Sequence, residues 1–462
     1  MAASTCLWEH WAQSAPTQIA LTTVQRQLTW LEVKQQVVQY RHQLIDRAIV
    51  QGQVVCLIGR AQETLVFAYL ACLAHGAVPA IVAQQSDELL EAKLSALYLK
   101  DEPAVVWNCC SSTELPSLHF QSRGTSQHRS AVPSDIDIAS IIFTSGSTGR
   151  PKAVVHGAEQ HIASASGLLE RFRFVVGDSW LLSLPMYHVS GLGIVWRWLQ
   201  SGAAIKIASG DFRQDISDVS HASLVSTQLK WIVDNQWPTK LERVLLGGSH
   251  IPLSLIQQAK VRHIDAWMGY GMTETASTVT AKPVDELPSS GYVLPRRKLK
   301  LDDGRIFVAG DTLAKGYYWQ GSILPLELQS QWLDTRDLGE WVNGNELRVI
   351  GRTDNLFISG GENVHCEEVE AALNTLPTIT QSIVIAVEDE EYGARCVAVV
   401  QSAALPTLDE QRQRLAELLP RFKQPVAYFL LPESLSRSGI KVSRAEVKKW
   451  LSQYQSNYVV IS

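Results

Sequence analysis

A loop of hydroxyl side chains, glycines and one lysine directly follows the apolar run Ile141–Phe143. The β-branched and aromatic residues of that run predict a buried strand. Glycine tolerates positive φ, so such a loop can turn several backbone N–H groups and hydroxyls toward one anion, and a lysine adds charge that a phosphate chain requires. The pattern predicts a phosphate-binding loop more strongly than a solvated surface turn. Its expected residues are Thr144, Ser145, Gly146, Ser147, Thr148, Gly149 and Lys152.

The spacing of this loop differs from that of a Walker A motif. Gly146 and Gly149 are too close together, and Lys152 is followed by Ala153 rather than by serine or threonine. Kinase and GTPase classes therefore lose their main support. The order T-S-G-S-T-G-x-P-K instead resembles the phosphate loop of adenylate-forming enzymes, which include acyl- and aryl-CoA ligases, peptide-synthetase adenylation domains and luciferases.

The resemblance implies ATP as a ligand and an α/β fold. That fold has a large N-terminal domain of mixed, mainly parallel sheets covered by helices, and a smaller mobile α+β C-terminal domain. We accordingly expect residues 1–351 to form the adenylation domain, with the ATP and acid sites. Residues 352–462 are expected to form the mobile domain with the catalytic lysine.

Two further segments fit the nucleotide site of that family. The stretch Trp267–Thr275 resembles its Y-G-x-T-E signature. The resemblance implies that Tyr270, beside Gly271, stacks on adenine, and that the Thr273 hydroxyl donates to the α-phosphate. Glu274 would hold Mg²⁺, which neutralises charge on the transferring nucleotide. A glycine turn after a predicted strand is expected to let adenine lie close to the backbone, and its residues are Gly247, Gly248 and Ser249.

The next segments resemble the ribose site and the inter-domain hinge. Asp337 would anchor the ribose hydroxyls, since a carboxylate can accept two hydrogen bonds from vicinal hydroxyls. Arg336 stands before it where the family has glycine. Arg352 is expected to reach the nucleotide and Asp354 to be the hinge. The glycines of the following hairpin would pass near the pantetheine arm of CoA, and they are Gly360 and Gly361.

A lysine near the C-terminus completes the set. The stretch Ser438–Arg444 resembles the family's S-G-K-[IV]-x-R loop, with Ile440 inserted before Lys441. The retained spacing to Arg444 favours Lys441, not Lys448 or Lys449, as the catalytic lysine. The resemblance implies that it bridges the attacking carboxylate and the α-phosphate.

The acid substrate is indicated by a separate segment. Residues 187–199 contain His188, which follows a predicted strand and in the family borders the acyl pocket, so we count it with the catalytic residues. This segment, residues 360–362 and the inserted Ile440 most resemble the o-succinylbenzoate–CoA ligases of menaquinone biosynthesis. That substrate is a dicarboxylate, so its unreacted carboxylate needs a polar or cationic partner. The sequence identifies no buried arginine for this purpose, and the expected pocket residues are His188, Ser190, Ser226, Gln228 and Thr275.

The expected reaction is attack of a carboxylate on the α-phosphorus of ATP, release of pyrophosphate, and transfer of the acyl group from AMP to CoA. Other interpretations stay open at this point. They are another aryl- or acyl-CoA ligase, a stand-alone adenylation domain that loads a carrier protein, a luciferase-type oxidoreductase, and a non-catalytic nucleotide sensor. A sensor would have no use for Lys152, Glu274 and Lys441 together.

Composition restricts the partners. The chain has a net charge of −5 and 46% apolar residues, which gives no reason to expect nucleic acid or an anionic membrane. We find no apolar run near the ~18 residues of a membrane span, so we expect no spanning helix, and we expect no signal peptide. The 7 cysteines lack metal-ligand spacing, which favours the reducing cytoplasm. The expected partners are the acid, ATP, Mg²⁺ and CoA, with a homo-oligomer left open.

Alternating strands and helices should position these residues. In the first half, strands are expected at Val54–Ile58, Ala77–Val82, Val105–Trp107, Ile138–Phe143, Trp180–Leu184 and Ala203–Ile207, with a helix at Glu63–His75. This alternation predicts parallel sheets covered on both faces. Residues 111–136 are expected to be an exposed connection. Later strands are expected at Arg305–Val308, Glu346–Ile350, Leu356–Ser359, Gln381–Val387 and Cys396–Gln401, with helices at Cys366–Asn374 and Asp409–Leu419.

Overall fold

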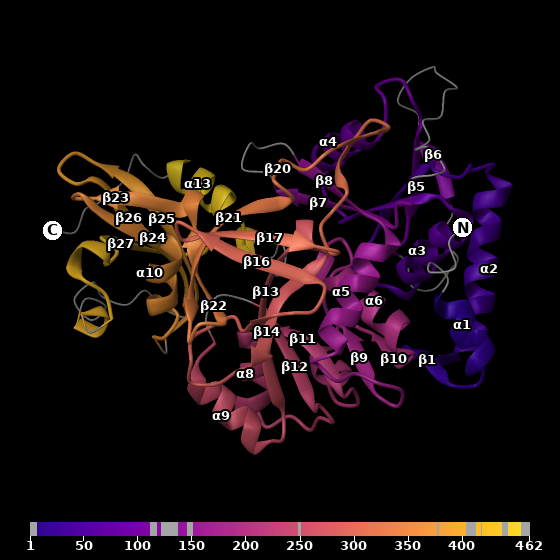
Figure 1. Cartoon of the computed structure of the whole chain (residues 1–462), viewed down its shortest axis with the longest axis horizontal. Coiled ribbons are helices and arrows are strands. Elements are labelled where there is room, and N and C mark those ends of the chain that lie inside the picture. Colours follow the sequence, from indigo (N-terminus) through magenta and orange to yellow (C-terminus); the bar gives the residue numbers. More distant parts are fainter. Residues whose placement is uncertain are drawn as a thin grey trace.

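The computed structural model describes most of the chain (Figure 1). The described residues are 7–110, 118–121, 137–145, 151–247, 251–376, 378–402, 413–416, 418–436 and 442–453. The helices α1 (Leu7–Ser14) and α2 (Trp30–Asp46) lie at one end of the molecule. The C-terminal elements, orange to yellow in Figure 1, lie at the other end.

One sheet carries the phosphate-loop strand. Its order is β19-β18-β8-β7-β4-β3-β5-β6, and the four strands β7, β4, β3 and β5 run parallel. All five residues of β3 are buried, as expected for a parallel strand that is covered on both faces. The bounds are β3 (Val54–Ile58), β4 (Val78–Val82), β5 (Ala104–Asn108), β6 (Leu118–Gln121), β7 (Ser140–Ser145), β8 (Pro151–His156), β18 (Gly316–Trp319) and β19 (Ser322–Leu324).

A larger sheet carries the other predicted nucleotide residues. Its order is β16-β17-β21-β22-β15-β14-β13-β12-β11-β9-β10-β1-β2, with β20 paired to β21. The run from β1 to β13 is parallel, and the strands from β13 to β16 are antiparallel. The bounds are β1 (Ile19–Thr22), β2 (Gln27–Thr29), β9 (Ser179–Leu182), β10 (Ala204–Ile207), β11 (His221–Val225), β12 (Arg243–Gly247), β13 (Asp265–Met272), β14 (Ser277–Pro283), β15 (Tyr292–Val293), β16 (Arg297–Asp302), β17 (Arg305–Gly310), β20 (Leu328–Gln329), β21 (Trp332–Val342) and β22 (Glu346–Arg352).

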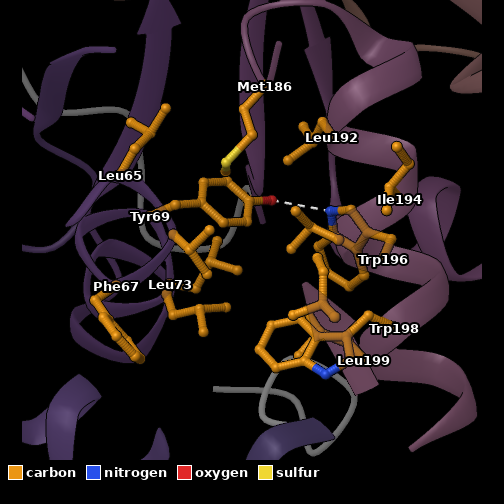
Figure 2. Close-up of a cluster of buried hydrophobic side chains, with 14 of the residues drawn as sticks. Leu65, Phe67, Tyr69, Leu73, Met186, Leu192, Ile194, Trp196, Trp198 and Leu199 are labelled. Carbon is orange, nitrogen blue, oxygen red and sulfur yellow. Dashed lines mark hydrogen bonds between the residues drawn. The ribbon is translucent and has the colours of Figure 1, made fainter. Parts of the chain in front are cut away.

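Apolar helices join the two sheets. Helix α3 (Glu63–His75) is buried from Thr64 to Leu73 and ends at Gly76, whose φ of +80° is typical of a helix C-cap. Figure 2 shows its side chains facing those of α6 (Val189–Ser201) in one apolar cluster. The Trp196 Nε1–H donates to the Tyr69 hydroxyl at 2.9 Å inside that cluster. The other helices of this part are α4 (Asp87–Leu97), α5 (Ala158–Leu169), α7 (Phe212–Asp215), α8 (Ser226–Asp234), α9 (Leu253–Val261) and the 3₁₀ turn η1 (Thr273–Thr275).

The C-terminal elements form separate small sheets. A hairpin pairs β23 with β24, and a second sheet has the order β25-β26-β27. The last strand of the large sheet, β22, ends at Arg352, so the expected boundary after residue 351 falls where the sheets change. The division into two domains stays a prediction. The bounds are η2 (Thr353–Asn355), β23 (Leu356–Ser359), β24 (Glu362–His365), α10 (Cys366–Leu373), β25 (Ile379–Asp389), β26 (Gly393–Ser402), η3 (Arg421–Lys423), β27 (Ala427–Leu430), α12 (Glu433–Ser436) and α13 (Arg444–Gln453).

The structure confirms the alternating α/β pattern and corrects one part of it. The predicted strands of both halves are present, with ends that differ by a few residues, as are the helices at 63–75 and 366–374. The segment 111–136 is not wholly an exposed connection, because β6 pairs with β5 and Leu118 is buried. Residues 409–412 and 417 of the expected helix Asp409–Leu419 lie outside the described residues, and residues 413–415 of it are helical. Among the helices described, none is long and apolar enough to cross a membrane.

A buried ion pair joins strands β14 and β22 of the large sheet. Lys282 on β14 is 1% exposed, and its Nζ contacts the Glu346 carboxylate at 2.8 Å and that of Asp285 at 2.5 Å. Burial alone would raise the pKa of Glu346, but hydrogen bonds from Lys282 and Ser289 prevail and hold the pKa below its usual value. The carboxylate is therefore charged at neutral pH and depends on the lysine.

We expect Lys282→Met to lower the free energy of unfolding by about 3 kcal/mol, because it leaves the buried Glu346 carboxylate without its cation. Urea denaturation measures this change. Lys230→Met is the matched control: it breaks the exposed pair with Asp234 and should cost less than about 0.5 kcal/mol. Equal losses in the two variants would contradict a structural role for the buried pair.

Candidate active site

The two ends of the predicted phosphate loop lie side by side. Strands β7 and β8 are antiparallel neighbours, and Thr144 is paired with Lys152 while Ser145 is paired with Pro151. The Lys152 Nζ lies 5.2 Å from the centre of the Tyr317 ring, which favours a cation–π contact. Gly146, Ser147, Thr148 and Gly149 lie outside the described residues.

Tyr317 also contacts the predicted magnesium ligand. Its hydroxyl donates to Glu274 Oε1 at 3.2 Å, and burial together with that carboxylate raises the pKa of the phenol. The backbone carbonyl of Glu274 accepts from the Ala314 N–H at 2.8 Å, which fixes the turn that also carries Thr273. The structure therefore brings Lys152, Tyr317 and Glu274 into one cluster.

The chemistry of Glu274 fits a Mg²⁺ ion. The described residues contain no group of three or more side chains that could hold a metal by themselves. Magnesium usually keeps several waters and binds through one or two carboxylates plus substrate phosphates. A single carboxylate next to a phosphate-loop lysine matches that requirement.

The predicted adenine and ribose residues form a second cluster. The Tyr270 hydroxyl donates to Asp337 Oδ2 at 2.6 Å, and Arg352 Nη1 donates to Asp337 Oδ1 at 3.2 Å. Burial and the adjacent carboxylate raise the pKa of Tyr270 well above its usual value. A carboxylate has about four lone-pair positions, and the role of Asp337 as the anchor of the ribose hydroxyls stays a prediction.

Glycine and arginine positions explain the local backbone of this cluster. A Cβ on Gly271 would lie 1.8 Å from the Ser277 carbonyl oxygen, so only glycine allows β13 and β14 to approach here. Arg336 has a φ of +61°, the left-handed region that glycine adopts without strain. The turn before Asp337 therefore forms with arginine in place of the family's glycine. Gly247 is exposed at the end of β12, and Gly248 and Ser249 lie outside the described residues.

The residues expected around the acid lie at the starts of two helices. His188 and Ser190 begin α6, and the His188 ring lies 4.7 Å from that of Tyr187. Partial burial and the Lys93 cation lower the pKa of His188. Ser226 and Gln228 begin α8, where the Gln228 Oε1 accepts from the Val225 N–H at 3.1 Å.

The contacts of Thr275 do not favour its predicted place in the acid pocket. Its side chain is fully buried, and its hydroxyl is 3.0 Å from the Met272 carbonyl oxygen and 3.2 Å from that of Ser277. The hydroxyl is thus occupied by the backbone of its own turn. Thr275 and Gln228 serve local backbone groups in this structure, and their place in the acid pocket stays a prediction that these contacts do not favour.

A buried arginine that the sequence did not reveal lies behind that turn. Arg197 on α6 is 2% exposed, and its Nη2 is 3.4 Å from the hydroxyls of Ser277 and Thr278. No carboxylate of the described residues forms an ion pair with it. Burial and the nearby Arg297 lower its pKa to about 9, so the guanidinium is still charged at neutral pH.

Comparison with known proteins places this arrangement in a family. The family of AMP-binding enzymes matches residues 8–318, more than half of the chain. The chain belongs to the AMP-binding enzyme family.

Curated relatives within this family share one name. The 2-succinylbenzoate–CoA ligase of Escherichia coli K12 is 38% identical over 455 residues, covering 97% of this chain and 98% of the relative. The enzyme of the same name from Salmonella typhimurium is 37% identical, with the same coverage. An arginine-to-lysine variant of E. coli MenE with bound OSB-AMS has a TM-score of 0.85, 36% identity, and covers 98% of this chain and 100% of the other.

For this AMP-binding enzyme, the geometry unites some predicted site residues and leaves others apart. Tyr317 contacts both Lys152 and Glu274. Asp337 accepts hydrogen bonds from both Tyr270 and Arg352. The CoA-tunnel glycines Gly360 and Gly361 have φ values of +58° and +89° in the two-residue turn between β23 and β24, which is the geometry of a type I′ hairpin. Their contact with CoA stays a prediction, and Lys441 lies outside the described residues.

Sequence reasoning missed Tyr317 and Arg197. Tyr317 belongs to no motif; the pairing of β18 with β8 places it opposite Val154, on the strand that carries Lys152, and its hydroxyl donates to Glu274. Arg197 did leave a signal. It is the single charged residue in Val189–Ser201, within an otherwise apolar run that has no carboxylate to pair with it.

Proposed function

We propose that this enzyme ligates 2-succinylbenzoate to coenzyme A in menaquinone biosynthesis. An oxygen of the acid attacks the α-phosphorus of ATP, the bond to the bridging oxygen breaks, and pyrophosphate leaves. The CoA thiol then attacks the acyl carbonyl and loses its proton, and AMP leaves. Relatives of this name at 37–38% identity over nearly the whole chain support the assignment.

The single observation that carries the choice of acid is the buried guanidinium of Arg197. A buried charge is costly unless it is paired, so a cation without an anion in the protein favours an anionic ligand. Ser277, its hydroxyl neighbour, is paired with Met272 next to Thr273, the residue assigned to the α-phosphate. An acid with one carboxylate at Thr273 and a second at Arg197 uses both ends of this site.

The remaining residues account for ATP and its metal. Asp337 and Arg352 would hold the ribose end, with Tyr270 against adenine. Lys152 would neutralise phosphate charge, and Glu274 would hold the Mg²⁺, which supplies Lewis-acid stabilisation of the phosphates when bound. Lys441 would approach the reacting carboxylate from the C-terminal domain, and rotation about Asp354 would then admit CoA.

The free thiols support a cytoplasmic setting. The six cysteines within the described residues are all free. Free thiols in this number support the reducing cytoplasm as the site of action.

An acid panel tests the proposal. Purified enzyme with ATP, Mg²⁺ and CoA should release pyrophosphate with 2-succinylbenzoate at least about 100-fold more efficiently than with its mono-ester. In that mono-ester the unreacted carboxylate is esterified and carries no charge. That factor corresponds to the loss of one buried charge pair. The readout is kcat/KM from pyrophosphate release. Equal efficiency with the ester, benzoate or a fatty acid would overturn the assignment, and thioester formation on a phosphopantetheinyl carrier protein but not on CoA would favour the carrier-loading alternative.

A further inference from the structure

A single carboxylate connects the hinge to the segment that carries the catalytic lysine. Glu367 lies in the first turn of α10, and its Oε1 accepts from Asn355 Nδ2 at 2.5 Å and from Arg444 Nη1 at 3.0 Å. Asn355 directly follows the predicted hinge residue Asp354. Arg444 begins α13, three positions after Lys441 in the sequence. The same oxygen therefore bonds to both functional segments.

The Arg444 guanidinium also donates to two groups other than Glu367. Its Nη2 donates to Glu370 Oε1 at 2.5 Å, and its Nε donates to the Val384 carbonyl at 3.2 Å. The Val384 N–H in turn donates to Glu370 at 2.7 Å. With three anchors, Arg444 fixes the start of α13 to α10 and β25, and Glu367 extends that fixed unit to the hinge.

Glu367 also contacts the strand that precedes the hinge. A Cβ on Gly351 would lie 2.8 Å from Glu367 Oε2, so the glycine makes room for the carboxylate. Oε2 is buried and has no hydrogen-bond partner among the described residues. On the same side, Arg352 bridges Asp337 at 3.2 Å and Asp354 at 3.3 Å. Polar contacts thus run from the ribose cluster to Asp354, and from the adjacent Asn355 to Arg444.

We propose that Glu367 is a positioning residue that ties the Lys441 segment to the hinge, so that adenylate formation depends on it and thioester formation does not. The proposal rests on the proposed function, because it requires two half-reactions of which only the first uses Lys441. The charge-assisted contact fixes Arg444, the last residue of the lysine motif, relative to Asn355 at the hinge. Its loss should lower the rate of the step that needs the lysine and leave ATP binding unchanged.

The test measures the half-reactions separately in Glu367→Gln, which keeps the shape and removes the charge. Single-turnover pyrophosphate release should slow about tenfold, the effect of losing one charge-assisted hydrogen bond, with KM for ATP changed less than about twofold. Thioester formation from supplied acyl-adenylate and CoA should change less than about twofold. An equal loss in both half-reactions, or no loss in either, would overturn the proposal.

Matched variants separate positioning from folding. Glu368→Gln removes the neighbouring carboxylate, which pairs with Lys423 at 2.7 Å and does not contact the hinge, and both half-reactions should stay within about twofold of the unsubstituted enzyme. Asn355→Ala should reproduce the slow first step, and combining it with Glu367→Gln should add little, because both changes remove one contact. Additive losses would contradict a shared contact.

The outcome does not depend on the identity of the acid. If the unsubstituted enzyme prefers an acid other than 2-succinylbenzoate, the proposed substrate is wrong, and the half-reactions are measured with the preferred acid. If the unsubstituted enzyme forms no adenylate with any acid, both proposals fall.

Discussion

Replacing Arg197 by methionine should raise KM for 2-succinylbenzoate by about 100-fold or more while making the fold more stable. The substrate loses the cation that pairs with its second carboxylate, and truncation of a buried charge partner typically costs about 2–5 kcal/mol of binding. The unliganded protein, in contrast, loses a buried guanidinium that no described carboxylate neutralises. Methionine fills a similar volume without that desolvation penalty, so the free energy of unfolding should rise by about 1 kcal/mol.

Arg297 provides the matched control for this prediction. It is also buried, but its guanidinium is occupied by backbone carbonyls, those of Pro295 at 2.8 Å and Ser164 at 2.9 Å. Arg297→Met should therefore destabilise the protein by about 1–3 kcal/mol, because it leaves buried acceptors without a donor. The discrimination between 2-succinylbenzoate and its mono-ester should stay intact.

Chemical denaturation and the acid panel together decide between the two roles of Arg197. A destabilised Arg197→Met enzyme with unchanged KM for the diacid would make Arg197 a structural residue like Arg297. Higher stability of Arg197→Met, together with lost discrimination between the diacid and its mono-ester, would show that Arg197 serves binding at a cost in folding stability.

The sequence predicted the fold well where one physical signal dominates. Strand Val54–Ile58 and helix Glu63–His75 were predicted with the observed bounds, because a continuous apolar run between turns and a helix that ends at glycine leave few alternatives. Strand β6 was missed. Its four residues lie in a polar stretch, and they form a strand only because the edge of β5 is available to pair with them.

The sequence predicted the nucleotide residues more easily than the acid pocket. Tyr270 and Asp337 bond directly across 67 residues of sequence, and each belongs to a motif of the family. Hydroxyls and amides near helix starts are ambiguous, since they bind ligands or satisfy local N–H and C=O groups equally well. The side chains of Thr275 and Gln228 satisfy local backbone groups, and the sequence alone does not show this. Arg197 could have been inferred from an unpaired charge in an apolar helix.

Lys441→Ala should lower the rate of adenylate formation by about 100–1000-fold and leave thioester formation from supplied adenylate unchanged. In the first step negative charge builds on the α-phosphate and on the attacking carboxylate, and removing one preorganised cation from such a site costs about 3–4 kcal/mol of transition-state stabilisation. In the second step the lysine is expected to have moved away with the C-terminal domain. Pyrophosphate release and CoA-ester formation, measured separately, test both statements.

Lys448 and Lys449 make this prediction specific to Lys441. Both are exposed on α13 within eight residues of Lys441, so they share its charge and its region of the chain. Lys448→Ala and Lys449→Ala should leave both half-reactions within about twofold of the unsubstituted enzyme, because exposed charges contribute little at a distance. If either of them, rather than Lys441→Ala, slows the first step, the inserted Ile440 has shifted the catalytic position. If Lys441→Ala slows both steps equally, the lysine acts at a stage common to both, and domain alternation no longer explains its role.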